Sequence, residues 1–348
     1  MREVSRRRRA AQLTALALGA CVLGALVSGG ARAAQRPGGS RAQHTAPPSP
    51  SPSGGEVHTL HVRGNVYMLV GAGGNITVQT GNDGVLLVDA GLASMSDKVL
   101  AAVKQLSDRP IRYIIDTHVH PDHTGGNATI AKAGMTIAGG NVVGDIGASA
   151  GDQAAIIAFQ AVLDRMSEPA AGAAATPQAD WPTETYTTPE RKFFFNGEGI
   201  VLMHIPAAHT DGDTMVFFRR SDVVSTGDIF VTNGYPIVDL ARGGNIEGII
   251  AGLNRIIQVA IPADEQEGGT MIIPGHGRLC DIADVVFYQE MVTIIRDRVK
   301  SLIDKGMTLE QVQAARPTRD YDPRYGSDRG FWTTSKFVAA VYDSLKKH

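Results

Sequence analysis

A dense cluster of histidines is the feature that most constrains how this chain can fold. Three of its ten histidines and one aspartate stand within six consecutive residues, in the stretch THVHPDHTGGN at residues 117–127. Imidazole and carboxylate groups are typical metal ligands, so the cluster is either a polar turn rich in histidine or one half of a metal site. A metal site would need further ligands from distant segments, and a fold that brings them to the cluster.

The predicted strands fall into two blocks, each followed by helices. Apolar alternation and glycine-containing turns predict hairpins at the start of the first block. The strands are predicted at residues 57–62, 66–70, 76–80, 85–88 and 111–115, and then at 191–195, 201–205, 214–219, 223–225 and 271–273. Helical spacing of apolar residues predicts helices at 94–106, 125–133, 153–166, 246–259 and 283–303, and two short helices around 317–330.

This order of elements predicts the fold class. Two blocks of strands with helices after each indicate an α/β (α+β) fold: a four-layer αβ/βα sandwich, in which two packed mixed β-sheets have helices on the outside. Loops at one edge of such a sandwich can bring distant segments together, as the histidine cluster requires.

Further ligand-type residues occupy one kind of position, a Gly- or Pro-containing loop just after an apolar strand. They are Asp89, His209, Asp228 and His276. A single residue of this kind is more often a hydrogen-bonded loop residue or part of a turn. To explain the whole pattern in this way, each of the four residues and the histidine cluster would all have to be ordinary loop residues independently. Their occurrence together therefore favours a metal site.

The whole pattern resembles the metallo-β-lactamase superfamily. The resemblance extends from about residue 57 to residue 277, and it implies the αβ/βα sandwich that the strands and helices already predict. The residues that carry it are, in chain order, Asp89, the HxHxDH motif (His118, His120, Asp122, His123), His209, Asp228 and His276.

The resemblance implies a centre with two zinc ions per chain, with iron and manganese as alternatives that use similar ligands. Asp228 would bridge the two ions, and Asp89 would orient the loop of the cluster without being a ligand. The ligands implied for the first ion are His118, His120 and His209, and those for the second are Asp122, His123 and His276.

Such a centre implies hydrolysis of a small-molecule substrate without a serine or cysteine nucleophile. A metal-bridging hydroxide would attack an amide or ester-type bond, with Asp122 as the catalytic residue that orients the nucleophile and moves a proton. Hydrolysis of a β-lactam is the first expectation. However, Asp228 stands where lactamases have cysteine or serine, and Val231 where they often have a lysine for the substrate carboxylate. A lactone hydrolase or a thiolester hydrolase of the glyoxalase II type is therefore the alternative.

Two other questions stay open at this point. A periplasmic metal-binding module without turnover would need only one closed, four-coordinate ion, whereas a complete second ligand set favours an enzyme. The walls of a substrate pocket are also uncertain. Candidates are the loop at residues 232–236, Trp181, and the later residues Tyr321, Arg324, Tyr325 and Lys336, all of which could equally be packing or surface residues.

The N-terminal residues 1–33 have the pattern of a secretory signal peptide, with arginines at residues 6–9, an apolar stretch and the cleavage-type sequence ARA at 31–33. The arginines are compatible with twin-arginine export, and Cys21 lies in a sequence similar to a lipoprotein box. Residues 34–55, rich in Pro, Ser and Gly, predict a disordered linker. The folded domain is expected at residues 56–348, with a C-terminal helical extension from about 281, and in the periplasm or outside the cell.

Charge and cysteine content limit the partners. Without the six arginines and the single glutamate of the signal peptide, the net charge of the chain changes from −2 to −7. A chain with this charge is not expected to bind nucleic acid or an anionic membrane surface, and no stable membrane span would remain after cleavage. Cys280 would then be the only cysteine, so no internal disulfide is expected. The oligomeric state is not determined by the sequence.

Overall fold

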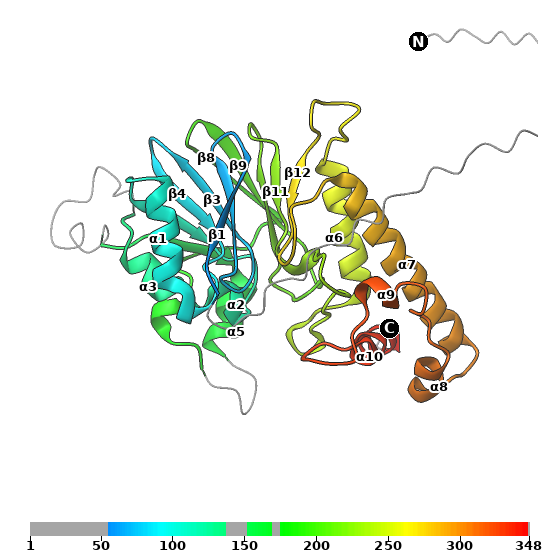
Figure 1. The fold of residues 1–348 in the computed structure, drawn as a ribbon. Helices are drawn as coiled ribbons and strands as arrows, with labels where there is room; N and C mark the ends of the chain where they lie inside the picture. The colour runs from blue at the N-terminus through cyan, green and yellow to red at the C-terminus, as the bar shows by residue number, and fades with distance from the viewer. Residues whose placement is uncertain (1–54, 137–151, 169–174, 347–348) are drawn as a thin grey trace, which may run out of the picture. The chain divides into compact units, whose positions relative to one another are not determined.

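Two β-sheets form the centre of the fold (Figure 1). The computed structural model describes residues 55–136, 152–168 and 175–346, so the predicted signal peptide and nearly all of the predicted linker lie outside the described residues. The strands of the first sheet, in spatial order, are β1 (His58–Arg63), β2 (Val66–Val70), β3 (Ile76–Gly81), β4 (Gly84–Val88), β5 (Ile111–Ile115), β6 (Ala155–Phe159) and β7 (Glu184–Tyr186). Those of the second are β12 (Met271–Ile273), β11 (Val223–Ser225), β10 (Thr214–Phe218), β9 (Glu198–His204) and β8 (Glu190–Phe195).

Helices cover the outer face of each sheet within the unit Pro48–His348. Figure 1 shows α1 (Ser96–Leu106) and α3 (Asn127–Lys132) on the side of the first sheet, and α6 (Ile246–Val259) and α7 (Ile282–Asp304) on the side of the second. The remaining helices are α2 (Pro121–Thr124), α5 (Gln160–Ser167), α8 (Leu309–Ala314), α9 (Asp322–Tyr325) and α10 (Thr334–Lys346).

Three apolar layers hold the sandwich together. The central layer lies between the sheets, where Val88 and Ile115 of the first sheet are buried with Leu202 and Val216 of the second. The two outer layers bury α1 and α3 against the first sheet and α6 and α7 against the second, and α10 packs on α6 and α7. Each fully buried aliphatic side chain contributes roughly 1.5–3 kcal/mol relative to an exposed one, which stabilises the layers. The order of the layers, with helices outside two packed sheets, confirms the predicted αβ/βα sandwich.

Strand direction brings the ends of several strands to one edge. β4, β5 and β6 run parallel to one another, and β11 runs parallel to β12. β9 and β11 both pair antiparallel with β10, so they also run in the same direction as each other. Because parallel strands end at the same edge, the loops that follow β4 and β5 meet one another, and so do those after β9, β11 and β12.

The structure corrects two of the predicted segments. Residues 153–166 do not form one helix: β6 occupies the first half and α5 the second, and β7 was not predicted at all. β6 is almost wholly buried, and a buried strand lacks the polar alternation that separates a strand from a helix. At the C-terminus, only the short α9 lies within residues 317–330, and the longer α10 follows it. In the described part of the chain, no helix is long and apolar enough to cross a membrane.

Candidate metal centre

Three predicted ligands of one ion meet where the loops after β5 and β9 converge. We call His118, His120 and His209 the first metal group, and their ligand atoms all lie within 4.8 Å of one another. The closest pair is His209 Nε2 and His120 Nδ1, which are 2.8 Å apart. The ring of His118 lies 4.6 Å from that of His209 and 4.9 Å from that of His120, centre to centre.

The three predicted ligands of the other ion lie beside this group. In the second metal group, which consists of Asp122, His123 and His276, the ligand atoms again lie within 4.8 Å of one another. His276 Nε2 is 3.2 Å from Asp122 Oδ2 and 3.3 Å from His123 Nε2. The loops after β5 and β12, which belong to different sheets, therefore supply one group.

Asp228 lies between the two groups, in a short 3₁₀ turn (Gly227–Ile229) after β11. Its Oδ1 atom is 3.3 Å from His123 Nε2 and 3.5 Å from His276 Nε2, and its Oδ2 atom is 3.7 Å from His209 Nε2. The two oxygens of one carboxylate thus face different groups. This is the geometry that a bridging ligand needs.

Two buried atoms show that the site fits cations. Among the described residues, His118 Nε2 and Asp228 Oδ1 have no hydrogen-bond partner although both are buried. A buried polar atom without a partner costs about 1–3 kcal/mol, and these two point toward the other ligand atoms, where a metal ion would satisfy them. Five imidazoles and two carboxylates also make a donor set that suits zinc, and iron or manganese as well.

The imidazoles are held from behind by hydrogen bonds. A metal-binding imidazole usually has a partner on its other nitrogen, which fixes its orientation and tautomer. The pairs are His118 Nδ1 with Thr117 Oγ1 (2.9 Å), His120 Nε2 with Asp239 Oδ2 (2.9 Å), His123 Nδ1 with Asp89 Oδ2 (2.8 Å) and His209 Nδ1 with the carbonyl oxygen of Ile237 (2.7 Å).

Asp89 organises the loop that carries the cluster, in the position that the resemblance implies for it. Its carboxylate accepts hydrogen bonds from the backbone N–H of Thr117 at 2.8 Å, from the Thr117 hydroxyl at 2.9 Å and from the His123 ring. Asp89 adopts a positive φ of 68°, a strained conformation for a residue with a side chain. The surrounding hydrogen bonds hold it there, and this strained residue links the end of β4 to the ligand loop after β5.

Asp239 is a residue of the site that the sequence did not predict. It lies just before the 3₁₀ turn η4 (Leu240–Arg242), accepts a hydrogen bond from the His120 ring and forms an ion pair with Arg242 at 2.7 Å. Nothing in the local sequence distinguishes it from an ordinary capping aspartate, because its side chain also accepts from the backbone N–H groups of Ala241 and Arg242. Its role depends on a contact with a residue 119 positions away.

Close backbone contacts also shape the centre. A Cβ atom on Gly74 would collide with the imidazole of His123, and one on Gly275 would collide with the Asp228 carboxylate and the backbone of Gly227. Glycine at these two positions lets the backbone approach the ligands. The sequence gives a signal here, since GAGGN and PGHG are unusually rich in glycine, but it does not say what the glycines approach.

The electrostatics of the two groups differ. Burial, reinforced by neighbouring imidazoles, holds the pKa of His118 well below its usual range, and burial lowers the pKa of His209 to about 4. Burial also opposes the charged form of His123, but the carboxylates of Asp228 and Asp89 outweigh it and raise the pKa of His123 well above normal. The same competition, with Asp228 and Asp122 as the carboxylates, raises the pKa of His276. Without metal, His118 and His209 are therefore neutral, whereas His123 and His276 attract protons.

Both carboxylates among the ligands are ionised. Burial disfavours the charge on Asp122, but the hydrogen bond with His276 and the nearby His123 lower its pKa to about 2. The charged form of Asp228 is likewise opposed by burial, and His276 and His123 hold its pKa well below the usual value. Asp122 is also the more accessible of the two, with 37 % of its side-chain surface exposed against 5 % for Asp228.

A cleft of about 430 Å³ opens above the two groups, with His120, Asp122, Asp228 and His276 in its floor. Of the wall candidates, Asn233, Gly234, Tyr235 and Tyr325 line this cleft. Trp181 does not line it, and instead packs against the small cluster of Ala158, Val162 and Met166. The tryptophan in the cleft is Trp332, which was not among the candidates.

The other histidines in the described part of the chain, His58, His61 and His204, do not belong to the metal centre. The ring of His204 stacks on Phe159 with the ring centres 3.5 Å apart, and its Nδ1 atom bonds to the carbonyl oxygen of Asp213. His58 and His61 lie on β1 at the edge of the first sheet.

The fold and the donor set together define a candidate metal centre at one edge of an αβ/βα sandwich. The family model described as the metallo-beta-lactamase superfamily matches residues 69–276, more than half of the chain, so the chain belongs to this superfamily.

Three known proteins are similar to the chain in sequence or in fold. The linear primary-alkylsulfatase of Pseudomonas sp. (strain ATCC 19151) is 47% identical over 45 residues, which are 13% of this chain and 8% of that protein. The solved sec-alkyl sulfatase Pisa1 from Pseudomonas sp. is 15% identical with a TM-score of 0.59, over 82% of this chain and 50% of its own. The DIM-1 metallo-beta-lactamase is 15% identical with a TM-score of 0.51, over 69% of this chain and 98% of its own. The chain thus spans about half the length of the alkylsulfatase structure, and these likenesses show the fold alone.

Proposed function

We propose that the protein is a dinuclear metallohydrolase, with zinc as the preferred metal, that cleaves an ester- or amide-type bond of a small molecule by activating water between two ions. The observation that carries the proposal is Asp228, whose two carboxylate oxygens face the two metal groups. His118, His120 and His209 would hold one ion, and Asp122, His123 and His276 the other. Two divalent ions bound there would lower the pKa of water and polarise the bond under attack.

The side chains around the ions have separate tasks. Asp122 is ionised, partly exposed at the floor of the cleft and hydrogen-bonded to His276, so it can orient a water molecule and then accept and pass on its proton. Asp228 is buried and keeps the spacing of the two groups. Asp89 holds the cluster loop through Thr117 and His123.

A non-catalytic metal-binding module is less well supported. Such a module would be satisfied by one closed ion, whereas here a second group of ligands opens onto a cleft. For the bond that is cut, hydrolysis of a β-lactam and hydrolysis of a lactone or thiolester were both expected. Among the described residues, those that line the cleft include Val231 and no lysine or arginine, and this supports an ester-type substrate over a β-lactam, which carries a carboxylate.

The proposal is tested by measuring the zinc content and the rate of hydrolysis in variants that lack a metal ligand. We expect two zinc ions per chain, and we expect His118→Ala and His209→Ala each to lower the zinc content by one ion per chain. Each should also lower the hydrolysis of a panel of nitrocefin, a lactone, a thiolester and a phosphodiester by at least about 100-fold. His58→Ala, on the exposed first strand, is the matched control and should behave like the wild type. Full turnover by a variant without metal, or a single closed ion in the wild type, would contradict the proposal.

We also propose that the protein is exported to the periplasm or beyond, because residues 1–33 have the charge and apolar pattern of a signal peptide. Sequencing the N-terminus of the mature protein from a periplasmic fraction would test this. An uncleaved N-terminus in the cytoplasmic fraction would rule it out.

A further inference from the structure

One wall of the cleft is supplied by a segment that lies outside the stretch matched by the family model. This segment, residues 325–334 between α9 and α10, is called the C-terminal wall below. Hydrogen bonds close it into a loop: the Thr334 N–H donates to the Ser327 carbonyl oxygen at 2.8 Å, and the Ser327 N–H donates to the Thr334 hydroxyl at 3.0 Å. The Trp332 indole N–H donates to the Pro236 carbonyl oxygen at 3.2 Å, which ties the wall to the loop opposite.

Apolar and aromatic side chains line much of the cleft above its floor, together with the polar residues Asn233, Ser327, Thr333 and Thr334. Phe331 and Trp332 line it from the C-terminal wall, and Val231, Tyr235 and Ile237 line it from the other side. Phe331 is 77 % exposed, although a large apolar side chain is stabilised by burial. An exposed aromatic residue at the mouth of a cleft over a reactive centre is a typical contact for an apolar part of a substrate.

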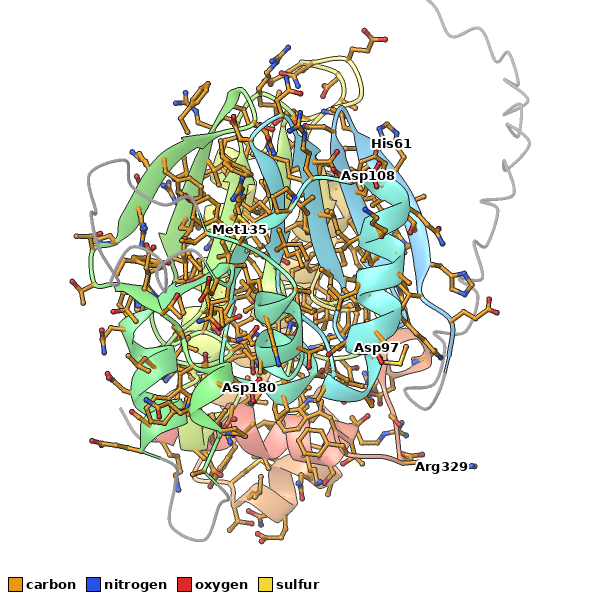
Figure 2. All side chains as sticks on the ribbon, turned by 90° about the vertical axis from the view of Figure 1, so that its left-hand side faces the viewer. His61, Asp97, Asp108, Met135, Asp180 and Arg329 are labelled. Carbon is orange, nitrogen blue, oxygen red and sulfur yellow. The ribbon has the colours of Figure 1, made fainter. Side chains whose placement is uncertain are left out.

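The basic residues Arg329 and Lys336 do not line the cleft. Arg329 is the one basic residue of the C-terminal wall, and Figure 2 shows its side chain pointing outward from this segment. Lys336 Nζ donates to the Phe331 carbonyl oxygen at 2.7 Å and lies over the Phe331 ring. It lines a neighbouring hollow of about 550 Å³, not the cleft. Therefore no lysine or arginine among the described residues lines the cleft to bind an anionic group of a substrate.

We propose that the substrate is an uncharged carboxylic ester or lactone whose apolar acyl part lies against Phe331 and Trp332. This inference rests on the proposed function and names its substrate class. In the reaction, water adds to the carbonyl carbon, the bond from that carbon to the alcohol oxygen breaks, and the alcohol oxygen takes a proton. An ester gives one carboxylic acid and one alcohol, and a lactone gives a single hydroxy acid. Phe331 and Trp332 determine which esters are accepted, while the residues of the floor perform the reaction.

The kinetic test compares three esters with one leaving group, using the zinc-loaded protein. p-Nitrophenyl acetate, butyrate and hemisuccinate differ only in the acyl chain, and hemisuccinate matches butyrate in length but ends in a carboxylate. Each buried methylene is worth about fourfold in kcat/KM, so butyrate should exceed acetate by about 15-fold. The hemisuccinate should fall at least about tenfold below butyrate, because its charge would enter an apolar surface without a partner.

Two variants locate the effect on the C-terminal wall. Phe331→Ala and Trp332→Ala should each lower the preference for butyrate over acetate, measured as the ratio of their kcat/KM values, by several-fold. Phe194→Ala is the matched control, because Phe194 is also highly exposed, at 73 %, but lies on β8. An unchanged preference in both wall variants would overturn the inference. So would a preference for hemisuccinate that Lys336→Met abolishes.

A binding measurement separates this inference from the proposed function. The chain has only two tryptophans, Trp181 and Trp332, so each single Trp→Ala variant reports on the other. Titration with hexanamide should change the fluorescence of Trp181→Ala, in which Trp332 remains, and not that of Trp332→Ala. Acetamide should have no effect on either variant at the same concentration. If hexanamide binds in this way but neither an ester nor any compound of the panel named above is hydrolysed, the proposed function fails. If esters are hydrolysed but Trp332 does not respond to hexanamide, this inference fails.

Discussion

Asp239 shows how one residue outside the ligand set can control the metal centre. Its carboxylate holds the His120 ring from behind at 2.9 Å, so His120 can direct Nδ1 at the ion. We expect Asp239→Ala to weaken zinc binding by about 10–100-fold, the usual effect of losing such a partner. A competition titration with a zinc chelator measures the change.

Arg242→Met is the matched control for this prediction. It removes the ion pair with Asp239 but leaves the hydrogen bond to His120 in place. Its zinc affinity should stay within about threefold of the wild type. Equal losses in both variants would mean that Asp239 acts through the turn that it caps and not through His120.

At the same scale, the sequence predicts ligand-type residues better than their partners. His209, Asp228 and His276 were visible because each follows an apolar strand in a loop with glycine or proline, and the structure brings all three to the cluster. Asp239 and Trp332 carry no comparable local signal. Their positions depend on contacts with His120 and Pro236, which are far away in the chain.

Among the elements, α10 supports the cleft from beneath. Phe337 of this helix is fully buried, and its ring stacks on Tyr235, a residue of the cleft, at 4.6 Å between ring centres. We expect Phe337→Ala to lower the free energy of unfolding by about 3–5 kcal/mol, because it leaves a cavity in the core. Urea denaturation of the zinc-loaded protein measures this.

Phe287→Ala serves as the control on a neighbouring helix. Phe287 lies on α7 and is 43 % exposed, and the guanidinium of Arg324 lies over its ring. Its loss should cost less than about 1 kcal/mol. A small cost for Phe337→Ala as well would show that α10 does not carry the packing described above.

Elements with clear periodicity or turns were the ones predicted well. The hairpins of the first sheet follow from alternation and from Gly64 and Gly84, which adopt positive φ in the turns. β6 was taken for a helix because its run AIIAF is buried on both faces and has no polar alternation. α10 was missed because the sequence does not reveal that residues 334–346 pack against α6 and α7.

For the molecule as a whole, the different electrostatics of the two groups predict that metal is released in two steps as the pH falls. Protons compete with metal ions for imidazoles, and a residue with a raised pKa is protonated at a higher pH. The pKa values of His123 and His276 are raised, whereas those of His118 and His209 are lowered. The second group should therefore lose its ion first.

Zinc content after equilibration between about pH 8 and about pH 5 tests this order. We expect a change from two ions per chain to one before the second ion is lost. In His276→Ala, the first step should be absent and the second should remain at the same pH. Simultaneous loss of both ions, or an unchanged two-step profile in this variant, would contradict the assignment.

The reactive floor and the aromatic wall come from separate lengths of chain, one within residues 69–276 and the other at 325–334. Mutations during evolution can therefore change the residues of the aromatic wall while the metal ligands of the floor stay the same. Close relatives with the same seven ligands but a different tail should accept different molecules, and grafting such a tail here offers a direct route to redirecting the enzyme.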